Sequence, residues 1–238
     1  MEGSAKRSGA GGALMCKPAA SRGAQQKIVQ ERGCNVIAEL DRSKRALRLS
    51  LKADLLSVRD EVRAELSDRL SQKLLGLSRV REASMVLLFL PMPHEPDLTH
   101  LARSLIERGV TVCLPRIDWE RGVFRPCRVA SVDEGLEIRR YNVPEPPVDA
   151  PEVDPVSLDV VLAPALAFDR LGNRLGQGAG MYDRFLSDSM LRAWVCGVGY
   201  ESQLVSGLPA GPDDQKVDAV ATDRRLLLFP GRQRQGMD

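Results

Sequence analysis

The sequence of 238 residues contains few of the residue types that nucleic-acid-binding surfaces require. Phe, Trp and Tyr together make up only 4% of the chain, so platforms that stack nucleic-acid bases are not expected. Lys and Arg number 34 against 32 Asp and Glu, and this near balance also argues against a general nucleic-acid-binding face. We therefore expect small-molecule partners and no nucleic acid.

Cysteine and histidine are also sparse. The five cysteines are odd in number and scattered, and none forms a CxxC pair. The two histidines, His94 and His100, have no cysteine near them in the sequence that would complete a metal site. These absences argue against a disulfide framework and a zinc site, and they favour reduced thiols and a cytoplasmic location.

No apolar stretch approaches the roughly 20 residues of a membrane-spanning helix, so no membrane partner is expected. Residues 1–40 are rich in Gly, Ala, Ser and basic residues, and acidic residues are scarce before Glu31. We expect a flexible head at 1–40, either a disordered tail or a targeting segment, followed by one domain at 41–230 and a short tail at 231–238.

From Leu47 to Leu74, Leu and Val recur at spacings of three and four residues, with charged residues between them. This pattern predicts one long amphipathic helix or two abutting ones, with a break within 54–59. The apolar run at 84–90 then predicts a buried strand, 97–108 a helix and 110–114 a second strand. A strand, a helix and a strand in this order predict a parallel pair.

The second half of the sequence continues this alternation. The apolar run at 159–168 predicts a strand that leads directly into a glycine-rich loop, followed by a helix at 180–190. Further strands are expected at 194–199, 217–222 and 225–229. The pattern predicts an α/β fold: a single three-layer domain with a mostly parallel sheet, related to doubly wound folds.

The most informative segment is the loop from Arg174 to Asp183, in which Gly176, Gly178 and Gly180 alternate with other residues. Three missing Cβ atoms allow backbone N–H groups to converge on an anion such as a phosphate. Arg174 offers a fixed positive charge and Asp183 a hard oxygen ligand for Mg²⁺. The glycines taken alone leave a second reading open, a tight turn that binds nothing.

The residues around these glycines carry a family resemblance. Phe168-Asp169, Gly172 to Gly176, Gly178, Gly180 and Tyr182-Asp183 resemble the signature of the 5-formyltetrahydrofolate cyclo-ligase family. The remaining matches follow the family's order along the chain, from about residue 43 to residue 222: Ser43 to Arg48 near the amino terminus, Glu95 after the first strand, Leu208-Pro209, and Asp213 to Asp218 near the end.

The resemblance implies an enzyme that uses ATP, with Mg²⁺, to convert 5-formyltetrahydrofolate into 5,10-methenyltetrahydrofolate, ADP and phosphate, without a protein nucleophile. A monomer or a weak dimer is expected. By resemblance, the metal ligands are Asp183 and Asp214, and the folate contacts are Leu90 and Glu95. The implied ATP-binding residues are Lys44, Arg45, Ala46, Leu47, Arg48, Arg174, Leu175, Gly176, Gln177, Gly178, Ala179, Gly180, Met181 and Tyr182.

Gln177, Ala179 and Met181 depart from the family pattern, in which Arg, Lys, Gly, an aromatic residue or His often stand at these positions. The loss of a charge there would raise the barrier to phosphoryl transfer. Two alternatives therefore stay open: a non-catalytic nucleotide- or folate-binding relative, and another ATP-dependent or sugar-phosphate enzyme on the same scaffold. Asp213 also competes with Asp214 for the second metal position.

Overall fold

The computed structural model describes residues 22–230, and the chain divides into two units between Glu39 and Leu40. Helix α1 (Arg22–Leu56) contains the boundary, and everything below concerns the unit that begins at Leu40. The head predicted at 1–40 lies outside the described residues as far as residue 21, and from Arg22 it is helical. The predicted tail, 231–238, also lies outside them.

The centre of the second unit is a seven-stranded sheet with the order β12-β11-β9-β6-β1-β2-β3. Five neighbouring strands are parallel, and β3 and β12 pair antiparallel at the two edges. The prediction of a mostly parallel sheet is therefore confirmed. The strands are β1 (Met85–Leu87), β2 (Thr111–Asp118), β3 (Val123–Val129), β6 (Val160–Pro164), β9 (Trp194–Val198), β11 (Ala219–Ala221) and β12 (Leu226–Leu228).

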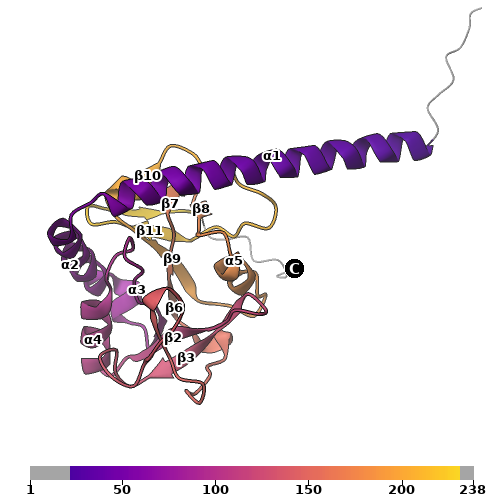
Figure 1. Ribbon diagram of the computed structural model, residues 1–238. Coiled ribbons are helices and arrows are strands. Elements are labelled where there is room, and N and C mark those ends of the chain that lie inside the picture. The colour runs from indigo at the N-terminus through magenta and orange to yellow at the C-terminus, as the bar shows by residue number, and fades with distance from the viewer. Residues whose placement is uncertain (1–21, 231–238) are drawn as a thin grey trace, which may run out of the picture. The chain divides into compact units, whose positions relative to one another are not determined.

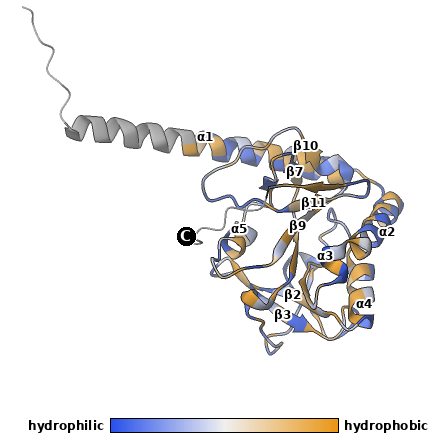
Figure 2. Cartoon of the chain, turned by 180° about the vertical axis from the view of Figure 1, so that it is seen from behind, coloured by the Kyte–Doolittle hydropathy of each residue, from blue (hydrophilic) through white to orange (hydrophobic). Residues whose placement is uncertain are grey.

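Alternation along the strands divides the core into two layers, because successive side chains point to opposite faces of a sheet. Val86 and Leu88 belong to one apolar cluster, together with α2 (Asp60–Gly76), α3 (Ser78–Arg81) and α4 (Thr99–Glu107). Leu87 belongs to the other, together with α5 (Met181–Leu186). Figure 1 shows α2, α3 and α4 on one side of the sheet and α5 on the other, and Figure 2 shows hydrophobic residues concentrated along the strands. The three-layer prediction is confirmed.

The break predicted within 54–59 is present. Helix α1 ends at Leu56 and α2 begins at Asp60, and the guanidinium of Arg63 donates to the Val58 carbonyl oxygen across the junction at 2.9 Å. The start of the first helix lies well before the leucine pattern, at Arg22. Lys44 and Arg48 therefore lie within a continuous helix and not at its first turn.

The prediction of one strand over 159–168 that runs directly into the glycine loop is wrong. The main-sheet strand β6 ends at Pro164, because a proline has no N–H with which to extend the ladder. The chain then forms β7 (Ala167–Asp169), which pairs parallel with β10 (Leu204–Val205) and antiparallel with β8 (Arg174–Leu175). The glycine loop follows this hairpin and not a strand of the main sheet.

The turn of the β7–β8 hairpin is fixed by the buried carboxylate of Asp169. It accepts hydrogen bonds from the backbone N–H groups of Leu171 at 2.8 Å and Asn173 at 3.0 Å. Gly172 has φ +78°, and a Cβ there would lie 2.9 Å from the Val217 carbonyl oxygen, so only glycine fits. The hairpin holds the start of the glycine loop firmly against the last strands of the chain.

Helix α5 covers only Met181–Leu186, about half of the predicted 180–190. After it, Asp188 accepts a hydrogen bond from the backbone N–H of Met190 at 2.8 Å, a local contact that competes with continuation of the helix. Because the helix is so short, its dipole adds little to anion binding at the loop. The remaining short elements are β4 (Glu137–Ile138), β5 (Pro144–Glu145), η1 (Arg140–Asn142), η2 (Pro155–Ser157) and η3 (Glu201–Gln203).

Candidate active site

A cavity of about 880 Å³ lies beyond the carboxyl ends of β1, β2 and β6, the edge at which parallel α/β sheets bind ligands. One wall is a face of α1, on which Asp41, Lys44, Arg48 and Lys52 follow one another at spacings of three and four residues. Another wall is the whole glycine loop. The cavity therefore brings together segments that are more than 120 residues apart in the sequence.

The contact between α1 and the glycine loop is made by Arg48. Its Nε donates to the carbonyl oxygen of Gly176 at 2.9 Å. Gly178 has φ +106°, a backbone conformation that favours glycine, and a Cβ there would lie in van der Waals contact with Arg48, 3.4 Å from its guanidinium carbon. The result is a fixed positive charge held directly against a loop with exposed backbone.

Lys44, one helical turn before Arg48, is paired with Asp214. Its Nζ lies 2.5 Å from the Asp214 carboxylate, and both side chains are largely removed from solvent, 11% and 20% exposed. The same carboxylate oxygen accepts the backbone N–H of Gly211 at 2.6 Å. Asp214, and not Asp213, is therefore the acid that faces the cation of α1.

The second ion pair joins Arg174 and Asp183 at 2.6 Å. The Arg174 side chain is only 2% exposed, its Nε has no hydrogen-bond partner among the described residues, and burial lowers the pKa of its guanidinium. Asp183 is 25% exposed and also accepts the backbone N–H of Gln215 at 3.0 Å. Because Gln215 follows Asp214, this bond holds the two acidic residues close together.

These two carboxylates form an incomplete metal site by themselves. No group of three or more His, Cys, Asp or Glu side chains that could hold a metal exists among residues 22–230. One oxygen of each carboxylate is engaged by a cation, which leaves the other oxygen of each for a hard divalent ion. Mg²⁺ is commonly held by one or two carboxylates, with water and substrate phosphates as its remaining ligands, so the donor set fits that ion.

The turn after β1 supplies a different kind of carboxylate. Glu95 is buried beside Leu90, accepts the backbone N–H of Met92 at 3.0 Å, and has a raised pKa because burial disfavours its charged form. Its neighbour His94 contacts Gln177 of the glycine loop, and burial, with the charges of Lys52 and Arg63, lowers the pKa of His94 to about 4. An apolar pocket with one such acid suits a neutral heterocycle with N–H groups.

The same cavity is also lined by residues that were not identified from the sequence. The guanidinium of Arg140 lies 4.7 Å from the ring centroid of Trp119 and 5.1 Å from that of Tyr141. Glu145 is buried, accepts the Ile117 backbone N–H at 3.0 Å and has a pKa raised by burial. No motif in the sequence distinguishes Trp119, Arg140, Tyr141 or Glu145.

Most residues predicted for the site lie around this one cavity: Lys44, Arg48, Leu90, Glu95, Asp183, Asp214 and every residue from Arg174 to Tyr182. Arg45, Ala46 and Leu47 are not among its lining residues, and Arg45 and Ala46 are exposed. Their proposed contact with ATP stays a prediction.

A sheet with helices on both faces and a cavity that joins a glycine loop to cations and acids define an α/β protein built to hold a phosphate-bearing ligand. A model of the 5-formyltetrahydrofolate cyclo-ligase family matches residues 41–223. The chain belongs to the 5-formyltetrahydrofolate cyclo-ligase family. The match spans the whole cavity, from Asp41 to Gln215.

Individual relatives agree with this assignment. The chain is 33% identical over 198 residues to the 5-formyltetrahydrofolate cyclo-ligase of Mycolicibacterium smegmatis, covering 79% of this chain and 97% of that one. It is 30% identical to the Escherichia coli K12 enzyme over 175 residues, 70% and 92% of the two chains. The structure of Aquifex aeolicus 5,10-methenyltetrahydrofolate synthetase matches with a TM-score of 0.68 at 29% identity, over 82% of this chain and 95% of that one.

Proposed function

We propose that this protein is a 5-formyltetrahydrofolate cyclo-ligase, which uses ATP to close 5-formyltetrahydrofolate to 5,10-methenyltetrahydrofolate with release of ADP and phosphate. The observation that carries the proposal is one cavity in which a glycine loop, three fixed cations and two carboxylates face a buried acid in an apolar pocket. The ligase relatives named above support the same activity.

The phosphate end of the cavity is the loop from Arg174 to Tyr182. Backbone N–H groups between the glycines bind phosphate oxygens, and Arg48, Lys44 and Arg174 balance their charge. Arg48 is already held in place by its bond to the Gly176 carbonyl oxygen. A preorganised cation of this kind loses little entropy when the nucleotide binds.

Asp183 and Asp214 hold Mg²⁺ between them, together with phosphate oxygens of the nucleotide. The bound ion supplies charge neutralisation at the phosphate that is transferred. The proposal is supported by the bond from Gln215 to Asp183, which keeps the two acids adjacent before any ligand arrives.

The folate end of the cavity is the pocket around Leu90 and Glu95. Glu95, with its raised pKa, hydrogen-bonds the N–H groups of the pterin, and Leu90 covers the ring. A buried acid of this kind discriminates strongly, because a ligand without the matching groups leaves it unpaired.

With both substrates in place, the formyl oxygen of the folate attacks the terminal phosphorus of ATP and ADP leaves. N10 of the folate then attacks the activated formyl carbon, loses its proton, and phosphate departs with the former formyl oxygen. Both reacting atoms belong to the substrates, so the protein's contribution is orientation and stabilisation of charge. Arg48, Arg174 and the loop amides supply that stabilisation at the phosphoryl group.

The experiment is a direct assay: purified protein, MgATP and 5-formyltetrahydrofolate are mixed, and the strongly absorbing methenyl product is followed. Asp183→Ala should lose product formation, whereas Asp213→Ala, which lies outside the two ion pairs, should keep most of it. Binding of both substrates without turnover would instead favour a non-catalytic relative, as Gln177 and Met181 suggested. Binding of ATP alone would favour another reaction on this scaffold.

We further propose a reducing compartment, the cytoplasm, and a monomer or weak dimer. Cys113, Cys127 and Cys196 are free and buried within the described part of the chain. Burial raises the pKa of Cys113 and of Cys196 to about 12, which keeps both as unreactive thiols. No helix within residues 22–230 combines the length and apolarity needed to cross a membrane.

A further inference from the structure

One side chain outside all the predicted site residues ties two walls of the cavity together. Arg184, in α5, donates from Nε to the carbonyl oxygen of Gly122 at 2.9 Å, and its Nη2 reaches the same oxygen. Nη2 also donates to the carbonyl oxygen of Ala179 at 2.5 Å. Gly122 forms the tip of the β2–β3 hairpin and Ala179 lies in the glycine loop, so a single guanidinium links segments about 60 residues apart.

The backbone is shaped around this guanidinium on both sides. Gly122 has φ +63° and Gly180 has φ +66°, conformations that other residues rarely adopt. A Cβ at Gly122 would lie 2.8 Å from Nη2 of Arg184, and one at Gly180 would lie 2.9 Å from Nη1. Both glycines therefore lie directly against the end of the same charged side chain.

Both linked segments contribute residues to the cavity lining, although Gly122 itself is not one of them. The hairpin carries Trp119, which lines the cavity beside Arg140 and Glu145, and the glycine loop lines the phosphate end. An apolar contact runs in parallel with the guanidinium, because Phe124 of β3 packs on Phe185 with ring centroids 4.6 Å apart. The segment of the glycine loop and α5 is thus joined to the hairpin by a polar and an apolar contact.

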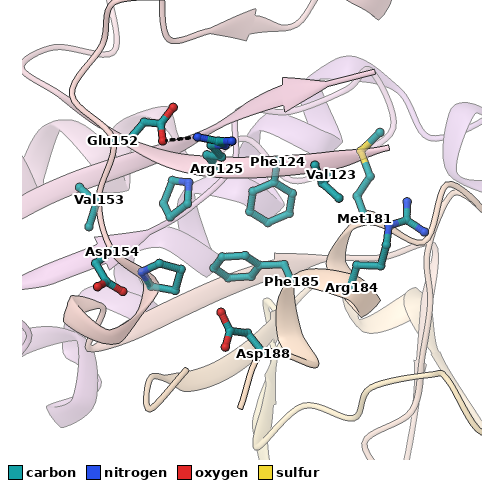
Figure 3. Close-up of a pocket in the computed structure, with 12 residues that line it drawn as sticks. Val123, Phe124, Arg125, Glu152, Val153, Asp154, Met181, Arg184, Phe185 and Asp188 are labelled. Carbon is teal, nitrogen blue, oxygen red and sulfur yellow. Dashed lines mark hydrogen bonds and ion pairs between the residues drawn. The ribbon is translucent and has the colours of Figure 1, made fainter. Parts of the chain in front are cut away.

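Figure 3 shows the region behind this link. Val123 and Phe124 of β3, together with Met181, Arg184 and Phe185 of α5, line a second cavity of about 410 Å³. Because space remains on this side, the hairpin and α5 are not close-packed over their whole contact. Besides the packing of Phe124 on Phe185, the bonds of Arg184 are a polar contact that joins α5 and the glycine loop to the hairpin turn.

We propose that Arg184 is a positioning residue that couples nucleotide binding at the glycine loop to the position of Trp119, and thereby to folate affinity, because Trp119 lines the same cavity as Leu90 and Glu95. The inference rests on the proposed function, since the loop is the nucleotide site only under that proposal. A phosphate that draws the Ala179 backbone inward moves the Gly122 tip with it. Each substrate then raises the affinity for the other by the same factor.

The test uses the full chain with Trp194→Phe, which leaves Trp119 as the only tryptophan of the two in the sequence. Trp119 fluorescence is recorded during titration with Mg²⁺ and adenylyl imidodiphosphate, which ATP-dependent ligases do not turn over. Calorimetry gives the Kd of 5-formyltetrahydrofolate with and without this analogue. The variant is Arg184→Ala, and the control is Arg121→Ala on the same hairpin turn, whose ion pair with Asp118 spans 3.7 Å at the surface.

We expect the analogue to tighten folate binding by roughly 5- to 150-fold in the parent and in Arg121→Ala, the usual range for coupled sites. In Arg184→Ala the factor should fall below about 2 and the Trp119 response should disappear, while the analogue's own Kd changes less than about threefold. Arg184→Lys keeps a charged donor that reaches one carbonyl oxygen, and it should recover part of the coupling.

Three results would overturn the inference. Arg184→Ala could retain both the coupling factor and the Trp119 response within twofold of the parent. Arg184→Ala and Arg184→Lys could instead both lose affinity for the analogue itself by more than tenfold. Arg184 would then only support the conformation of the glycine loop. Failure of the analogue to bind the parent is distinguishable from both, because it refutes the proposed nucleotide site as well. Arg184 is exposed, so its removal leaves the apolar core intact, and should the alanine variant still unfold, the lysine variant decides.

Discussion

The buried ion pair between Arg174 and Asp183 gives the sharpest prediction, because its two partners are buried to different degrees. The Arg174 side chain is 2% exposed and that of Asp183 is 25% exposed. Asp183→Asn and Arg174→Met remove the same pair from opposite sides. We expect them to destabilise the fold unequally, with the larger loss for Asp183→Asn.

The expected magnitudes follow from what each change leaves behind. Asp183→Asn leaves a buried guanidinium with no counter-ion, and breaking a buried pair in this way costs about 3–5 kcal/mol. Arg174→Met leaves a carboxylate that water and the Gln215 N–H still solvate, and it also removes the unpartnered Nε, so the loss should be about 1 kcal/mol. For a domain of this size the two changes lower Tm by about 6–20 °C and about 2–4 °C.

Urea unfolding followed by circular dichroism measures both free energies, and an unchanged m-value shows that the unfolded states are comparable. Glu65→Gln is the matched control, because it breaks an ion pair with Arg69 in which both partners are about 60% exposed, and it should cost less than about 1 kcal/mol. An Arg174→Met protein as unstable as Asp183→Asn would refute the reasoning. Turnover should fall at least a hundredfold in both variants of the buried pair, whatever their stability.

Three further predictions concern single positions. Because the pKa of His94 falls from 6.5 to about 4 on folding, the folded state favours the neutral imidazole. The contribution of His94 to stability is therefore full above pH 6.5, and about 3 kcal/mol of it is lost as the pH drops through 4. Urea unfolding across that range should show a flatter dependence of stability on pH for His94→Gln than for the parent. Lys44→Met should raise the KM for ATP at least tenfold in the product assay, which corresponds to about 1.4 kcal/mol or more of lost binding, whereas Arg59→Met, at an exposed residue that does not line the cavity, should change it less than threefold. Gly178 has φ +106°, and a Cβ there would lie 3.4 Å from Arg48, so Gly178→Ala should lose ATP binding measured by calorimetry. The control is Gly135→Ala, at φ +74° in open space, which carries only the conformational cost of about 1–3 kcal/mol and should still bind ATP.

The sequence predicted the main sheet well, because buried parallel strands are continuous apolar runs that alternate with amphipathic helices. The prediction failed where one apolar run contained two strands. Nothing in the apolar pattern from Asp159 to Phe168 separates β6 from β7, and only Pro164 marks the point at which the chain leaves the sheet. The length of α5 was overestimated for a similar reason, since the contact of Asp188 with the backbone depends on a turn that the pattern does not reveal.

The site, like the fold, has parts that the sequence predicted and parts that it did not. The glycine loop, Glu95 and the acids near the end of the chain are local motifs, and sequence reasoning placed them on one cavity. Trp119, Arg140 and Glu145 come from a hairpin and an irregular connection, and only long-range packing brings them to the cavity. Arg184 is next to the best motif of the chain, yet its role depends on where the β2–β3 hairpin ends, which no local pattern specifies.

Under the proposed function, the two ion pairs also explain how a site with two acids can receive an anionic nucleotide. Before binding, the acids Asp183 and Asp214 are neutralised by Arg174 and Lys44, so the phosphate end faces the substrate without net repulsion, and Arg48 adds one positive charge. Mg²⁺ bound with the nucleotide would be held by Asp183 and Asp214 and would supply positive charge to these acids, which would make Lys44 and Arg174 available to the phosphates. Because each charged side chain exchanges one partner of opposite charge for another, no charge is left buried and unpaired, and the desolvation cost of nucleotide binding stays low. A nucleotide without the divalent ion cannot drive this exchange, and it should therefore bind far more weakly than the complex of the two.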